Sequence, residues 1–117
     1  MSLFSRSGFE TFVHGLAGTS LVDQWESRVA KVGEKVFALL TDGENRLAFK
    51  VSEESFEILT ALDGISQAPY FAKRKWVTVN PDTELSEADV RDYLTRSYRT
   101  VSASLTRKLR SELGIAD

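Results

Sequence analysis

Two groups of cations are the residues of this sequence whose types and spacing suit a chemical task, the binding of phosphate. The first group is the run Lys73-Arg74-Lys75, in the turn before Trp76. The second group falls within about 80° on a helical wheel, opposite an apolar face. Arginine grips phosphate or carboxylate through two parallel hydrogen bonds, which lysine cannot do. This second group consists of Arg96, Arg99, Arg107 and Arg110.

Each group also has a simpler interpretation, which the sequence leaves open. An amphipathic helix normally carries charges on its solvated face. A turn beside an edge strand often carries lysines that keep the edge soluble. If the chain binds nucleic acid, we expect the phosphate contacts to come from Lys73, Arg74, Lys75, Arg96 and Arg99.

Length and composition fit one globular domain over residues 1–117. The net charge is −2, which excludes a uniformly basic protein that coats nucleic acid by charge alone. The charge is uneven, however: residues 1–72 carry six basic and ten acidic groups, and residues 73–117 carry nine basic and seven acidic groups. If the chain binds nucleic acid, the contact is therefore expected in residues 73–117.

The sequence offers little for catalysis or metal binding. It contains no Cys, and His14 is its one histidine, so thiol nucleophiles and multi-histidine metal sites are excluded. The common glycine-rich phosphate loops are absent too. Glu53, Glu54 and Glu57 are explained by the favourable position of carboxylates near a helix start. We expect no catalytic residue, no metal and no cofactor.

Localisation is expected to be cytoplasmic. No apolar run approaches the roughly 18 residues of a membrane helix, and the first residues lack the apolar core of a signal peptide. The lack of Cys fits a reducing compartment. We therefore expect no membrane partner.

Three helices are predicted from apolar stripes and capping signals. The first spans residues 7–17, with Ser7 and Glu10 as a capping box and Gly18 in a left-handed position after its end. The second spans residues 52–63 and begins at Ser52. The third spans residues 86–113 from the cap Ser86; at 1.5 Å per residue it is roughly 40 Å long, so its end is expected to project or to pack on a second subunit.

Strands are predicted between these helices. Residues 20–32 have mixed patterning and are interpreted as one irregular strand. Residues 35–41 are apolar on both faces, as in a central strand, and form a hairpin with residues 46–51. Residues 67–72 and 75–80 form a second pair. The expected fold is α+β: a two-layer sandwich with an antiparallel sheet of about five strands and helices on one face, in the order α-β-β-β-α-β-β-α.

Three blocks of the sequence resemble the MmcQ/YjbR family over about residues 9–109. Residues 25–40 are similar to the family segment W-G-x-P-x-x-K-V-G-G-K-x-F-A-x-L, and residues 46–50 lead into an acidic helix start as the family does. Residues 68–79 resemble the block A-P-x-Y-x-N-K-x-x-W-x-x-V, and residues 85–90 with Ser97 and Tyr98 resemble the C-terminal element. The chain departs from the pattern at Glu26, Arg28 and Ala72, where Gly, Pro and Asn are usual.

The resemblance implies a two-layer fold akin to secretion chaperones and a predicted DNA-binding role with a double-wing motif. Lys31, Lys73 and Trp76 are family positions, and the resemblance brings no catalytic residue. Two hypotheses follow. The first is a DNA-binding module that uses the cationic turn and the arginine-lined last helix. The alternative is a protein- or peptide-interaction module, with a partner protein or a second copy on a sheet face or edge.

Overall fold

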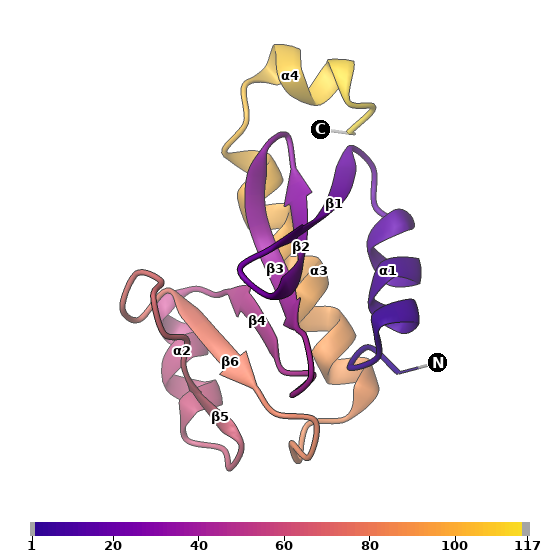
Figure 1. The fold of residues 1–117 in the computed structure, drawn as a ribbon. Coiled ribbons are helices and arrows are strands. Elements are labelled where there is room, and N and C mark those ends of the chain that lie inside the picture. The colour runs from indigo at the N-terminus through magenta and orange to yellow at the C-terminus, as the bar shows by residue number, and fades with distance from the viewer. Residues whose placement is uncertain (1, 116–117) are drawn as a thin grey trace.

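A six-stranded antiparallel sheet with helices packed against one face makes up the computed structural model, which describes residues 2–115 (Figure 1). The strands lie in the order β1-β2-β3-β4-β6-β5. This confirms the expected α+β fold, with one strand more than expected. The elements along the chain are α1 (Arg6–His14), β1 (Thr19–Gln24), β2 (Ser27–Val32), β3 (Lys35–Thr41), β4 (Leu47–Lys50), α2 (Glu53–Thr60), β5 (Ile65–Gln67), β6 (Trp76–Val79), α3 (Glu87–Ala103) and α4 (Arg107–Glu112).

The additional strand comes from residues 20–32, which form a hairpin and not one irregular strand. Strands β1 and β2 pair up to Gln24 opposite Ser27, so Trp25 and Glu26 form a two-residue turn. Both turn residues have a left-handed backbone, with φ of 53° and 54°. Turns of this kind match the twist of the strands but usually carry Asn-Gly or Asp-Gly. The pair Trp25-Glu26 is not typical of such turns, so the sequence did not predict a turn here.

The main core lies between the sheet and the helices. Helix α1 contributes Phe9 and Val13, α2 contributes Leu59 and α3 contributes Leu94, and all four are fully buried. Strand β3 is central and is buried on both faces, as its apolar sequence predicts. The helical layer thus fixes one face of the sheet and leaves the other available.

The N-terminal cap of helix α1 lies two residues earlier than expected. Ser5, not Ser7, has the extended backbone of a cap residue, and its hydroxyl accepts a hydrogen bond from the Gly8 N–H at 3.1 Å. The helix ends at His14. Gly18 has the expected left-handed backbone, with φ of 74°, but lies beyond the helix end in the turn to β1.

The prediction of a single last helix is wrong. Helix α3 ends at Ala103, and Thr106 caps a separate α4 by accepting the Leu109 N–H at 3.1 Å. Between them Leu105 is 7% exposed and packs beside Gly33, where an added Cβ would lie 2.8 Å from its Cδ1 atom. Burial of Leu105 and the Thr106 cap together turn the chain back. The overlong helix that suggested a second subunit is therefore absent, and the four arginines do not form one continuous stripe.

Candidate binding site

The outer face of the sheet, opposite the main core, carries a second apolar cluster. Its buried members are Val29, Leu39, Ala48, Ala68 and Trp76. Within residues 2–115, no helical residue belongs to this cluster, whereas the main core draws on the three longer helices. An apolar sheet face without a helical cover is a feature of binding surfaces.

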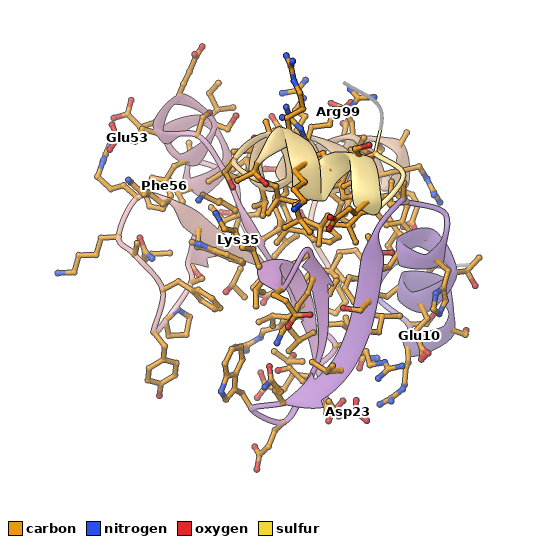
Figure 2. The ribbon with its side chains drawn as sticks, turned by 90° about the horizontal axis from the view of Figure 1, so that it is seen from above. Glu10, Asp23, Lys35, Glu53, Phe56 and Arg99 are labelled. Atoms are coloured by element: carbon orange, nitrogen blue, oxygen red, sulfur yellow. The ribbon has the colours of Figure 1, made fainter. Side chains whose placement is uncertain are left out.

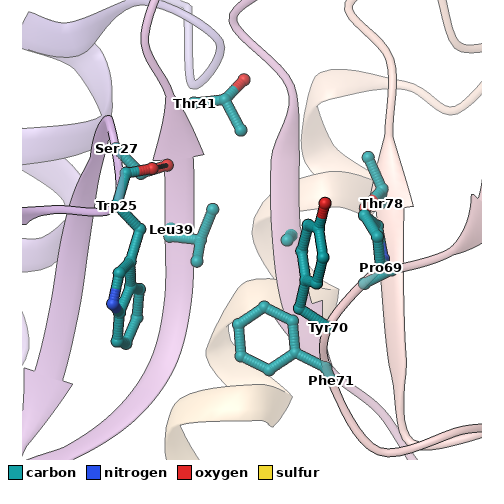
Figure 3. A pocket seen from close by; sticks show the side chains of 10 residues that line it. Trp25, Ser27, Leu39, Thr41, Pro69, Tyr70, Phe71 and Thr78 are labelled. Carbon is teal, nitrogen blue, oxygen red and sulfur yellow. Dashed lines mark hydrogen bonds between the residues drawn. The ribbon is translucent and has the colours of Figure 1, made fainter.

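A pocket of about 490 Å³ lies on this face, and we call it the open-face pocket (Figure 3). Leu39, Ala48 and Ala68 contribute apolar side chains to it, and none of the side chains that line it is charged. Four hydroxyl groups give it limited hydrogen-bonding capacity. They belong to Ser27, Thr41, Tyr70 and Thr78.

Aromatic residues from two distant segments stand at the edges of the open-face pocket. Trp25 comes from the β1–β2 turn and Tyr70 and Phe71 from the loop between β5 and β6, and Figure 3 shows Leu39 between the indole and the two other rings. Trp25 is 66% exposed and Tyr70 fully exposed, and with Ile58 they are the large apolar side chains that the described residues leave most exposed. Trp and Tyr are enriched among the residues that dominate binding energy at interfaces.

The backbone at both aromatic residues is unusual. Trp25 and Tyr70 have positive φ, 53° and 70°. A left-handed backbone costs a residue with a Cβ roughly 1–2 kcal/mol. Backbone strain of this kind concentrates at functional sites, where it holds a side chain in a required position.

The loop that presents Tyr70 is anchored at both ends. The Ala68 N–H donates to the Trp76 carbonyl at 3.1 Å, and the Phe71 ring stacks on Trp76 with centroids 4.1 Å apart. The Arg74 N–H donates to the Gln67 Oε1 atom at 2.8 Å. The prediction of a strand over residues 67–72 is therefore wrong: β5 ends at Gln67, and an ordered loop follows.

The predicted cations of that loop are exposed, but they differ in their surroundings. Lys73 and Lys75 form no ion pair with any described residue. Arg74 pairs with Glu57 on α2, and its guanidinium lies 5.5 Å from the centroid of the Phe56 ring. Arg74 therefore ties the loop to α2, which restricts its reach toward an external phosphate.

The predicted arginines of α3 lie on the other side of α2. Arg96 pairs with Asp92 at 2.9 Å and covers the Tyr93 ring, and Arg99 is exposed to solvent (Figure 2). Both arginines border a cleft with the opposite face of α2, which Glu54 and Ile58 line. The structure thus separates the loop cations from the α3 arginines. The helix between them carries Glu53, Glu54 and Glu57, so the five predicted residues do not form one basic surface.

Sequence reasoning missed the aromatic pair at the open-face pocket. Trp25 lies in the segment predicted as one irregular strand, residues 20–32, and Tyr70 lies in the predicted strand 67–72. Pro69 was the available signal, because proline is unfavourable within a paired strand and favours a loop there. The sequence also contained a signal for the Asp92–Arg96 ion pair, because residues four apart on a helix are neighbours.

Two further properties concern metals and membranes. In the part of the chain that the structure describes, no three His, Cys, Asp or Glu side chains come together as a metal site would require. None of the helices within residues 2–115 has both the length and the apolar character needed to cross a bilayer.

Comparisons with known proteins agree with this architecture. A family model described as YjbR matches residues 14–100. The crystal structure of protein DR2400 of Deinococcus radiodurans, with the family-model domain DUF419, has a TM-score of 0.85 and 26% sequence identity, and the match covers 95% of this chain and 88% of that one. A protein from Pseudomonas syringae has a TM-score of 0.70 and 20% identity over 82% of this chain and 97% of that one, and shares the fold. The comparison with curated proteins found no match.

Proposed function

Since the chain belongs to the YjbR family and exposes aromatic side chains beside an apolar pocket, we propose that it is a non-catalytic binding module. Its open-face pocket takes an apolar or aromatic side chain of a partner protein between Trp25 and Tyr70. The observation that carries this proposal is the pair of exposed aromatic side chains at the edges of an uncharged apolar pocket. We place this activity in the cytoplasm, which the absence of Cys fits.

The chemistry of the open-face pocket favours a protein segment over a phosphate-bearing ligand. No charged side chain lines it, so an anion there would lose its hydration without a compensating partner. An apolar side chain has no such hydration to lose, and its burial against Leu39, Ala48 and Ala68 is favourable. The hydroxyls of Ser27, Thr41 and Thr78 can then form hydrogen bonds with the peptide backbone on either side of that side chain.

Peptide selection tests this function directly. A displayed peptide library is selected against the immobilised protein, and the affinities of the enriched peptides are measured by calorimetry. We expect peptides with an aromatic or large aliphatic anchor. Trp25→Ala and Tyr70→Ala each weaken their binding by roughly thirtyfold, the effect of losing an interface residue worth about 2 kcal/mol. Both side chains are exposed, so the fold is retained.

Ile58→Ala is the matched control, because Ile58 is also a large exposed apolar residue but lies on α2, outside the open-face pocket. It leaves the affinity of the selected peptides unchanged. Peptides that bind the wild type and both aromatic variants equally well overturn the proposal, as does a selection without enrichment.

Nucleic acid is a second candidate partner, favoured by the exposure of Lys73 and Lys75 without an ion pair among the described residues. These two side chains are free to contact a phosphate backbone. Replacing both by Ala is expected to flatten the slope of log affinity against log salt by about two units on a random duplex. The matched control replaces Arg107 and Lys108, two exposed cations of α4. An unchanged slope in the loop variant assigns the lysines to solvation.

A further inference from the structure

A second cleft lies between α2 and α3, near the end of β4, and is unrelated to the open-face pocket. Its volume is about 460 Å³. Three cations line it, Lys50, Arg96 and Arg99, together with one carboxylate, that of Glu54. We call it the α2–α3 cleft. Its positive charge distinguishes it from the open-face pocket, which has no charged lining residue.

Two of the three cations have no ion-pair partner among the described residues. Within residues 2–115, neither Lys50 nor Arg99 forms an ion pair. Arg99 is exposed and Lys50 is half-buried, so both can reach a solute that enters the cleft. Unpaired like charges repel one another, and an anion between them relieves this repulsion.

The third cation is oriented by two contacts on its own helix. The Arg96 guanidinium lies 5.0 Å from the centroid of the Tyr93 ring, and its Nη2 atom is 2.9 Å from an Asp92 carboxylate oxygen. Guanidinium has five N–H donors, so this pairing leaves donors for a further acceptor. A donor that is already oriented loses less side-chain entropy when it binds.

The remaining lining residues define which anion fits. Thr100 and Ser55 bring hydroxyl groups, which commonly accompany arginine around phosphate oxygens. Ile58, which is 55% exposed, forms an apolar wall of the same cleft. We infer that the α2–α3 cleft binds a phosphomonoester, with the phosphate at Lys50, Arg96 and Arg99 and the organic group against Ile58. This inference is independent of the proposed function.

Two sources of this phosphate are distinguished by titration with four probes. Amide and arginine Nε signals of the labelled protein are followed by NMR with a nucleoside, the matching nucleoside monophosphate, and a short single strand with and without a 5′-phosphate. We expect both phosphorylated probes to bind with a dissociation constant near or below about 1 mM, a value typical of weak small-ligand sites. Equal affinity for these two assigns a small phosphomonoester, and much tighter binding of the phosphorylated strand assigns a nucleic-acid end.

Two substitutions in the α2–α3 cleft are expected to change the affinity in opposite directions. Arg99→Gln removes one charge-assisted contact and weakens binding roughly tenfold or more. Glu54→Gln removes the one carboxylate and strengthens binding a few-fold, an effect that general damage to the fold does not produce. Both side chains are exposed, so neither change threatens stability.

Control variants outside the α2–α3 cleft show whether binding takes place in that cleft. Arg91→Gln removes an exposed arginine of the same helix that lies over Phe12, and Arg46→Gln removes an exposed arginine that pairs with Glu44 outside the cleft. Both leave the affinity unchanged. Failure of both phosphorylated probes to bind overturns the inference. So does binding that Arg99→Gln and Glu54→Gln leave unaltered, or binding that Arg46→Gln weakens as strongly as Arg99→Gln does.

Discussion

The buried hydroxyl of Ser97 on α3 donates a hydrogen bond to the backbone carbonyl of Phe37 on β3, at 2.7 Å. The β2–β3 register shifts here, with Lys31 opposite Val36 and Ala30 opposite Ala38, so Phe37 has no residue opposite it in β2. The same hydroxyl accepts the backbone N–H of Lys50 at 3.1 Å. One serine thus completes the hydrogen bonding of a β-bulge and fixes α3 over two strands.

Ser97→Ala is expected to lower the free energy of unfolding by about 1–3 kcal/mol, because it leaves a buried carbonyl and a partly buried N–H without partners. Chemical denaturation measures the loss. Ser102→Ala is the matched control: Ser102 is buried on the same helix, but its hydroxyl bonds only to Arg99 of that helix. An equal loss in both variants contradicts the role assigned to Ser97.

Glu26→Gly is expected to stabilise the protein by up to about 1 kcal/mol. Glu26 has φ of 54°, and relief of a left-handed strain of roughly 1–2 kcal/mol outweighs the extra entropy that glycine gives the unfolded chain. This position is also where the family pattern has Gly. Gln24→Gly, in the neighbouring strand β1, lacks this strain and is expected to destabilise. If both variants lose stability, the turn is not strained.

Tyr98 is expected to make stability depend on alkaline pH. Burial raises the pKa of the Tyr98 phenol above its ordinary value, so the unfolded chain ionises first. This contribution to stability is complete below pH 10 and is lost as pH rises through the folded-state pKa. The difference in unfolding free energy between wild type and Tyr98→Phe, measured from pH 7 to pH 11, should therefore be constant up to about pH 10 and shrink above it. A difference that does not change with pH contradicts this prediction.

Thr106→Ala is expected to loosen α4 without unfolding the domain. The variant loses the cap on the Leu109 N–H, worth about 1 kcal/mol. No residue of α4 is buried, so the loss acts on local opening. Amide hydrogen exchange over residues 109–113 should accelerate roughly fivefold, while the denaturation midpoint barely moves. A midpoint that falls as after Ser97→Ala shows instead that α4 unfolds together with the core.

Local sequence patterns predicted those helices and strands in which apolar residues recur at one regular spacing. The helical spacing of Val90, Leu94, Tyr98 and Val101 predicted α3, and all four residues are buried. The pattern did not predict its end, because Leu105 keeps the helical spacing whether the helix continues or turns. What decides this is a contact with Gly33, far away in the sequence.

The candidate sites depend even more on contacts between distant segments. Trp25 and Tyr70 reach the same pocket only through the strand order β1-β2-β3-β4-β6-β5, which no local pattern contains. The sequence identified Arg74 and Arg99 as candidate cations for a phosphate contact. Their separation by α2, and the pairing of Arg74 with Glu57, come from tertiary packing.

The two tryptophans of the chain occupy opposite environments on the same face of the sheet. Trp25 is 66% exposed, whereas Trp76 is 7% exposed and stacked on Phe71. The intrinsic fluorescence of the folded protein therefore contains a red-shifted component that acrylamide quenches and a blue-shifted component that is shielded. Occupation of the open-face pocket moves the first component to shorter wavelength, and unfolding moves the second to longer wavelength. The native chain thus carries separate optical reporters of binding and of folding, with no added label.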